Sequence, residues 1–210
     1  IKKDPLLETF EKIESGFDKN KKILMNILLF LVVTVIGVSI FTTNQNKIDL
    51  DSKSAFGSAL VAFSNSDYDN AKFQFESIVS SYEGTESEVL SKYYLGKIYY
   101  EMGNLNQAKI LLNDFLDNTK EATLVCGAIK QLVDISFSQN DYSKNFEIIA
   151  KAKRYDINDI SRLELKLLKI NTLLKINDLQ SAKLEIGEIL NRKNLPSHVK
   201  QKLDEFKGVL

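Results

Sequence analysis

The first pattern along the chain is an apolar segment without a single charge. It covers the nineteen residues Ile23–Phe41, which read ILMNILLFLVVTVIGVSIF. At a rise of about 1.5 Å per residue, a helix of this length spans about 28 Å, close to the roughly 30 Å hydrocarbon core of a bilayer. Only Asn26, Thr34 and Ser39 interrupt its apolar faces. The pattern predicts a transmembrane helix, because a buried core helix would alternate with polar positions.

A cleaved signal peptide is the alternative interpretation of this segment. Signal peptides carry an apolar stretch of about 7 to 15 residues, followed by a cleavage site with small residues. The stretch here is longer, and residues 41–44 (FTTN) offer no such site. The 22 residues ahead of it are also long for a signal sequence and include five acidic residues. The sequence therefore favours a membrane anchor.

Lysines on either side of the apolar segment predict its orientation. Lys19, Lys21 and Lys22 precede it directly, whereas Lys47 and Lys53 beyond it are mixed with acidic residues. Cytoplasmic flanks carry the excess of positive charge. We therefore expect a single-pass protein of a bacterial inner membrane, with residues 1–22 in the cytoplasm and residues 42–210 in the periplasm.

The residues ahead of the apolar segment show a helical spacing of their own. Apolar side chains stand at Leu6, Leu7, Phe10, Ile13 and Phe17, with glutamates between them. This spacing predicts a short amphipathic helix, on the inner leaflet or against a membrane partner. The alternative is that residues 1–22 form a frayed segment in the cytosol.

Beyond residue 42 the chain repeats itself with a step of 37 residues. A turn signal begins at residues 66, 103, 140 and 177, and apolar positions follow each one at the same distances. The turns read Ser66-Asp67-Tyr68, Gly103-Asn104-Leu105, Asn140-Asp141-Tyr142 and Asn177-Asp178-Leu179. Four copies in register without a gap predict an array of repeated structural units.

The second copy, YYLGKIYYEMGNLNQAKILLNDFL, resembles a tetratricopeptide repeat (TPR). It carries small residues at Gly96 and Ala108, which let two helices approach closely. Large side chains fill the remaining motif positions, at Leu95, Tyr99, Leu112 and Phe115. The other copies are more divergent, since the third has Val133 and Asn145 at the two small positions and the fourth has Ile170.

The predicted fold is all-α. It comprises an amphipathic segment, a transmembrane helix, a linker, a TPR-type α-solenoid of about four helical hairpins and a C-terminal capping helix. The last helix is expected because Pro196 ends one helix and Ser197 can cap the next. In order, these parts are residues 1–22, 23–41, 42–51, 52–196 (hairpins 52–84, 88–119, 122–156 and 160–194) and 197–210.

Composition excludes several classes of function. The 28 basic and 28 acidic residues give a net charge of +0, which argues against a nucleic-acid-binding protein. One cysteine, Cys126, and one histidine, His198, leave few ligands for a metal site and few members for a catalytic triad. With no phosphate-binding loop or hydrolase motif, we expect no enzyme activity and no cofactor or metal.

The charges are unevenly distributed along the array. Residues 43–118 hold 6 basic and 11 acidic residues, net −5, whereas residues 119–210 hold 16 and 12, net +4. Ordinary solvated helix faces explain such a difference. The alternative is a gradient that orients a partner or pairs two copies head to tail.

The resemblance to TPR arrays implies a concave protein-binding face built by the first helix of each hairpin. An apolar groove of this kind suits a partner helix or an unfolded segment. The alternative is that several of its side chains simply pack between helices. By motif position the groove comprises Phe56, Leu60, Phe63, Tyr93, Lys97, Tyr100, Lys130, Asp134 and Phe137.

The layout as a whole resembles the bacterial family that includes the ancillary subunit of the SecYEG translocon, the YfgM-like proteins. That resemblance implies protein partners, namely the translocon, periplasmic chaperones or emerging secretory chains. The competing hypothesis is a fixed structural subunit of another cell-envelope complex, in outer-membrane assembly, division or motility.

Overall fold

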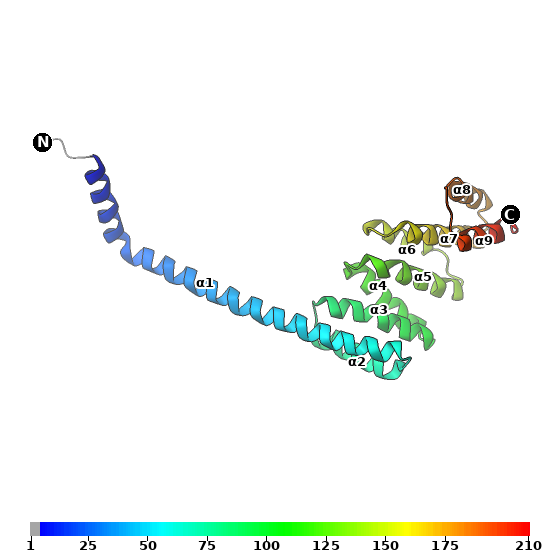
Figure 1. Ribbon diagram of the computed structural model, residues 1–210, viewed down its shortest axis with the longest axis horizontal. Coiled ribbons are helices and arrows are strands. Elements are labelled where there is room, and N and C mark those ends of the chain that lie inside the picture. Colours follow the sequence, from blue (N-terminus) through cyan, green and yellow to red (C-terminus); the bar gives the residue numbers. More distant parts are fainter. Residues whose placement is uncertain (1–4) are drawn as a thin grey trace. The chain divides into compact units, whose positions relative to one another are not determined.

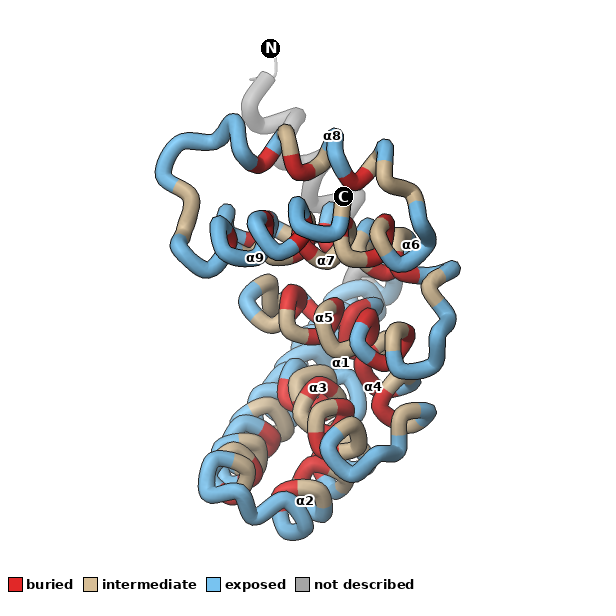
Figure 2. The backbone as a smooth tube through the Cα atoms, turned by 90° about the vertical axis from the view of Figure 1, so that its right-hand side faces the viewer, coloured by how far each residue is buried: buried red, intermediate tan, exposed pale blue. Residues whose placement is uncertain are grey.

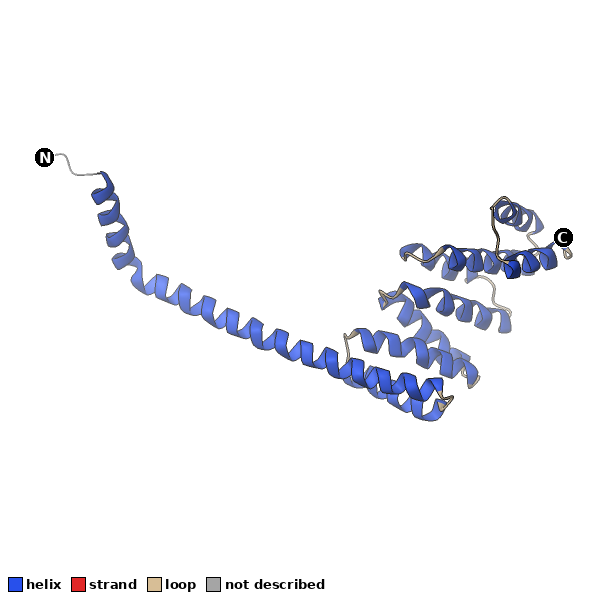
Figure 3. Ribbon diagram, in the orientation of Figure 1, coloured by secondary structure: helices blue, strands red, loops and turns tan. Residues whose placement is uncertain are grey.

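The computed structural model describes the backbone of residues 5–210 and the side chains of residues 22, 23 and 25–210. Over these residues the chain forms helices and connecting loops, and no strand (Figure 3). This confirms the all-α fold. The chain divides into two compact units, Ile1–Leu50 and Asp51–Leu210.

The helices follow one another with short connections (Figure 1). Their bounds are α1 (Pro5–Ser64), α2 (Tyr68–Ser81), α3 (Glu86–Glu101), α4 (Leu105–Asn118), α5 (Ala122–Ser138), α6 (Asn145–Ala150), the 3₁₀ helix η1 (Lys151–Arg154), α7 (Asp159–Lys175), α8 (Leu179–Leu190) and α9 (Ser197–Lys207).

The first unit consists of the N-terminal part of α1. Helix α1 is long and apolar enough, by length and composition, to cross a membrane, and its most apolar window is wholly exposed. Residues 42–51, where the sequence suggests a linker, are helical and belong to α1. The predicted amphipathic segment is helical from Pro5, but the side chains on which that prediction depends lie outside the described residues.

The second unit is a stack of helical hairpins. The end of α1 pairs with α2, α3 with α4, α5 with α6, and α7 with α8. Helix α9 packs on α7. The buried residues, red in Figure 2, lie mostly where neighbouring helices face one another. The fold is therefore a four-hairpin α-solenoid with a terminal helix.

The 37-residue step is visible in the backbone of the hairpin turns. Residues at one repeat position adopt the left-handed conformation, with φ of 59° at Ser66, 76° at Gly103, 54° at Asn140 and 62° at Asn177. The residue after each of them is Asp or Asn. In three hairpins its side chain accepts a hydrogen bond from the backbone N–H three residues on and caps the second helix.

The third hairpin departs from this pattern. The carboxylate of Asp141 accepts hydrogen bonds from the backbone N–H and the hydroxyl of Ser143, two residues on. Helix α6 begins only at Asn145, without a side-chain cap, and covers six residues before η1 follows. The corresponding helices α2 and α4 have 14 residues each and α8 has 12. The local Asp141–Ser143 turn thus competes with helix initiation.

Small residues set the distance between the helices of the second hairpin. A Cβ atom at Gly96 would lie 2.7 Å from Cγ of Leu112, so only glycine fits there. The equivalent positions hold Ala59, Val133 and Ile170, all fully buried. The increasing side-chain size means that the third and fourth hairpins cannot repeat the close approach of α3 and α4.

Candidate functional site

The predicted groove residues lie on three consecutive first helices, at the same repeat positions. Phe56, Leu60 and Phe63 lie on α1, while α3 carries Tyr93, Lys97 and Tyr100, and α5 carries Lys130, Asp134 and Phe137. Apart from the buried Tyr93 and the exposed Asp134, all of them are half-buried. Most of these side chains therefore combine packing with access to solvent.

An aromatic cluster joins the first two helices of the groove. Tyr94 lies at its centre, with ring centroids 5.1 Å from Phe63, 5.8 Å from Phe56 and 5.4 Å from Phe75, on which it stacks. Burial raises the pKa of the Tyr94 hydroxyl. Sequence reasoning missed Tyr94 because it lies one residue past the motif position, on the side facing α1 and α2.

Tyr93 belongs to the core and not to the open surface. Its side chain is only 7% exposed, and its ring lies 5.1 Å from that of Phe115. The hydroxyl occupies the space beside Gly127 on α5, where a Cβ atom would lie 2.6 Å from it. Burial, with smaller contributions from Tyr94 and Cys126, raises the pKa of Tyr93. Tyr93 therefore fixes α3 against α5 and leaves the groove surface to its neighbours.

Lys97 places a positive charge at the border of the aromatic cluster. Its Nζ lies 5.4 Å from the ring centroid of Phe63 and 5.7 Å from that of Tyr93. An ammonium group over aromatic faces is attracted by about 0.5 to 2 kcal/mol, depending on how far water is excluded. Lys97 therefore links α1 to α3 and keeps its charge at the groove.

Tyr100 on α3 and Asp134 on α5 interact electrostatically. Burial raises the pKa of Tyr100, and the carboxylates of Asp134 and Glu101 raise it further. Although the side chain of Asp134 is exposed, surrounding groups displace enough water to raise its pKa, against the opposing effect of Lys130. Phe137 packs its ring 5.5 Å from that of Tyr142. This end of the groove is thus aromatic with one carboxylate.

Lys130 belongs to a polar network that spans three helices. Its Nζ lies 3.0 Å from Oε2 of Glu164 on α7, and Oε1 of Glu164 lies 2.8 Å from Nε2 of His198 on α9. Burial alone would raise the pKa of Glu164, but the hydrogen bonds and charges of Lys130 and His198 lower it overall. Glu164 therefore ties α5, α7 and α9 together as a carboxylate.

The repeat positions of the predicted groove have counterparts on α7, which the sequence-based residue set did not include. One further step of 37 residues leads from Lys130 to Leu167 and from Asp134 to Asn171. Both residues line a cavity of about 290 Å³ between α7 and α9, together with His198 and Phe206. The repeat step of 37 residues, applied once more to the predicted groove positions, would have identified both residues from the sequence.

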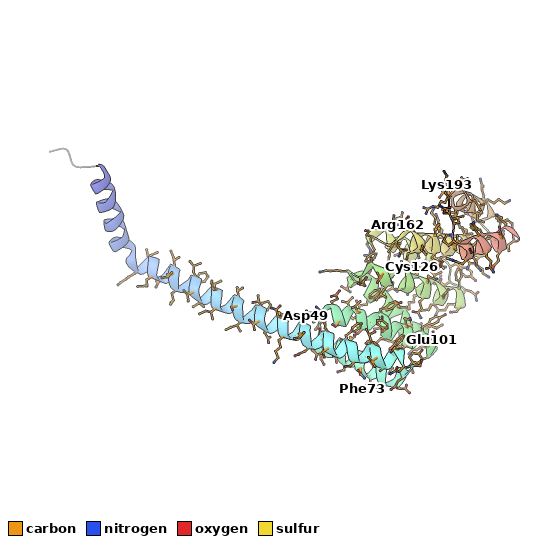
Figure 4. The ribbon with its side chains drawn as sticks, viewed as in Figure 1. Asp49, Phe73, Glu101, Cys126, Arg162 and Lys193 are labelled. Atoms are coloured by element: carbon orange, nitrogen blue, oxygen red, sulfur yellow. The ribbon has the colours of Figure 1, made fainter. Side chains whose placement is uncertain are left out.

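Cys126 is the single cysteine of the chain. Cys126 lies buried among the stacked helices (Figure 4), and burial raises the pKa of its thiol. Within the described part of the chain, no group of three or more His, Cys, Asp or Glu side chains is arranged to hold a metal ion.

Comparison with known proteins identifies the family of this chain. The family model described as a tetratricopeptide repeat-like domain matches residues 16–166. A comparison with curated proteins found no match. Because the family match covers more than half of the chain and includes the first three hairpins, the protein belongs to the tetratricopeptide repeat-like domain family.

Proposed function

We propose that this protein is a membrane-anchored scaffold whose groove binds other proteins in the bacterial periplasm. TPR-like domains are generally non-catalytic scaffolds for protein–protein interaction. The observation that carries the proposal is the row of half-buried aromatic and charged side chains on consecutive first helices, including Phe63, Lys97, Tyr100 and Phe137. Aromatic residues at the centre of an interface supply most of its binding free energy.

The apolar part of α1 supports the membrane anchor. Its large side chains are exposed, for example Leu29 at 65%, Phe30 at 70% and Val35 at 67%. A continuous apolar surface of this size is not stable in water, whereas a bilayer would cover it. The preceding lysines, Lys19 to Lys22, favour an N-terminus in the cytoplasm and a solenoid in the periplasm.

We infer that the partners are the Sec translocon, periplasmic chaperones or emerging secretory chains. The membrane anchor raises the effective concentration of the groove near the membrane, so that weak and exchangeable contacts with these partners suffice. The alternative is a fixed subunit of another cell-envelope complex, with a single stoichiometric partner.

Site-specific photo-crosslinking in living cells tests the groove. A crosslinking amino acid is placed at Lys97 or Tyr100, and at Phe73 as the matched control, since Phe73 is 73% exposed on the outer side of α2 (Figure 4). We expect crosslinks from the two groove positions and few from Phe73. Translocon subunits or many secretory chains would support the first set of partners, and one envelope protein the alternative. Equal crosslinking from all three positions would contradict a binding groove.

Extraction and fusion experiments test the anchor separately. We expect the intact chain to remain in the membrane pellet after carbonate washing, and a C-terminal alkaline phosphatase fusion to be active. Release into the supernatant, a shortened mature chain or an inactive fusion would contradict the proposed anchoring or orientation.

A further inference from the structure

The short second helix of the third hairpin leaves a cleft beside the fourth hairpin. Its volume is about 430 Å³, within the range of ligand pockets, and its walls come from α6, η1, α7 and the segment after α8. The floor is apolar, formed by Ile149, Ala152, Ile157 and Leu165. None of the predicted groove residues lines this cleft, so it is a second surface.

Every charged side chain that lines the cleft is a cation. Half of its ten lining residues are basic, and they come from three separate segments, although the whole chain has equal numbers of acidic and basic residues. The five cations are Lys153 on η1, Arg162, Lys166 and Lys169 on α7, and Arg192 after α8. Such a lining favours an anionic ligand with an apolar part.

The wall formed by η1 is fixed in place from behind. Lys151 and Arg154 turn away from the cleft to Asp117 on α4, with N–O distances of 3.0 Å and 3.2 Å. The hydroxyl of Tyr155 donates a hydrogen bond to the carbonyl oxygen of Leu116. Lys153 is therefore the one cation of η1 left at the cleft.

Carboxylates of the chain neutralise only part of this charge. Nζ of Lys166 lies 2.6 Å from Oε2 of Glu188, Lys169 pairs with Glu185, and Nη2 of Arg162 lies 3.4 Å from Oδ1 of Asp156. Lys153 and Arg192 have no ion-pair partner within 4.0 Å among the described residues. These two are the cations most available to an incoming anion.

The distribution of the cations distinguishes between ligands. Arg162, Lys166 and Lys169 on α7 already pair with carboxylates of the chain, so an incoming anion meets Lys153 and Arg192 first. These two cations come from separate segments, η1 and the residues after α8. A lipid anion has one charged head and would need its cations at one end of the cleft. Charges spread along the cleft fit a ligand with several carboxylates in a row.

We propose that this cleft binds a short acidic peptide segment of a partner protein, in which one apolar side chain lies between Asp or Glu residues. The apolar side chain would occupy the floor, and the flanking carboxylates would pair with the cations around it. This binding does not depend on the concave groove, so either surface can fail its test without affecting the other.

Fluorescence anisotropy with a defined peptide tests this proposal. The full chain is reconstituted in phosphatidylcholine nanodiscs, and the probe is a labelled, capped peptide with a central leucine between two glutamates on each side. We expect saturable binding that the double variant K153E/R192E weakens at least tenfold. The matched control K183E/K200E changes the same number of charges on exposed positions of α8 and α9, and we expect less than a twofold effect.

Two further measurements separate this site from simple charge attraction and from lipid binding. A peptide with serine in place of leucine should bind several-fold more weakly, because it leaves the apolar floor uncovered. Peptide binding should persist when phosphatidylglycerol replaces part of the phosphatidylcholine. Absence of saturable binding, equal affinity of the two double variants, equal affinity of the two peptides or displacement by the anionic lipid would each overturn the proposal.

Discussion

Glycine positions in the helices show how single residues determine helix packing. Gly96 contacts Leu112 so closely that an added Cβ would lie 2.7 Å from its Cγ, whereas a Cβ at Gly187 in α8 would meet nothing within 4 Å. Both residues are inside helices, where alanine is favoured over glycine by about 1 kcal/mol. Because helix propensity contributes equally at both sites, a difference between the two alanine variants reports the packing around the added Cβ.

We predict opposite effects of alanine at these two glycines. Gly187→Ala should stabilise the solenoid by up to about 1 kcal/mol. Gly96→Ala should destabilise it by about 1 to 2 kcal/mol, because overpacking costs more than the gain in propensity. Urea denaturation of the full chain in mild detergent, followed by circular dichroism, gives both values. Equal stability of the two variants would show that α3 and α4 tolerate a wider separation.

Asn145 is the second informative residue. It occupies the position of Ala71, Ala108 and Ala182, and all four side chains are fully buried. The side-chain nitrogen Nδ2 of Asn145 donates a 3.3 Å hydrogen bond to Oγ1 of Thr172, but the side-chain oxygen Oδ1 has no hydrogen-bond partner. An unpaired buried carbonyl costs about 1 to 3 kcal/mol.

Replacing Asn145 by the alanine of the other copies should therefore raise the free energy of unfolding by about 1 kcal/mol, after the loss of a small packed volume. Asn145→Asp serves as the contrasting variant, since it puts a charge in the same buried space and should be strongly destabilising. Chemical denaturation compares the two. A less stable Asn145→Ala would mean that the Thr172 hydrogen bond outweighs the unpaired oxygen.

At the scale of elements, one carboxylate links α5, α7 and α9 across their apolar contacts. Lys130 and His198 lower the pKa of Glu164 overall, and its side chain is 23% exposed. A carboxyl group whose pKa is lower in the folded state stabilises the fold above its unfolded pKa of about 4.3 and loses that contribution as the pH falls through the folded value.

We predict that Glu164→Gln costs about 1 kcal/mol at pH 7 and that this cost shrinks as the pH falls below about 4. Glu147→Gln, on the exposed face of α6, should leave the pH dependence unchanged. Unfolding free energies measured at pH 7, 5 and 3.5 provide the comparison. A cost that stays constant over this range would exclude a role for the ionised carboxylate.

Helix α6 shows where sequence reasoning stops at this scale. The repeat register predicted the four hairpin turns and the small positions Gly96 and Ala108, because sterics and turn conformation decide those residues locally. It did not predict that the carboxylate of Asp141 would accept hydrogen bonds from Ser143, so that α6 begins only at Asn145. The sequence does not distinguish an Asp that caps a helix from an Asp that stabilises a local turn. The cleft beside the fourth hairpin exists because α6 is short. The burial of Tyr93 depends equally on Gly127 in the next repeat.

For the solenoid as a whole, stability should vary from hairpin to hairpin. Each hairpin contacts only its neighbours, so weak units open locally without unfolding the rest. The third hairpin combines an uncapped six-residue α6 with the unpaired oxygen of Asn145. The second combines capped helices with the close Gly96–Leu112 contact.

We therefore predict that backbone amides of α6 and η1 exchange with deuterium at least tenfold faster than those of α3 and α4. Mass spectrometry of peptic fragments from the full chain measures this difference directly. Uniform protection across the four hairpins would instead indicate that the solenoid unfolds as a single cooperative unit.

The invariant 37-residue spacing of the left-handed turn residues has an evolutionary consequence. Ser66, Gly103, Asn140 and Asn177 occupy equivalent places with no insertion between copies. A duplication or deletion of one whole unit would keep the turns of the remaining hairpins in register, and only the side chains at one new junction would have to adapt. Lineages could therefore lengthen or shorten this array in discrete steps of one hairpin.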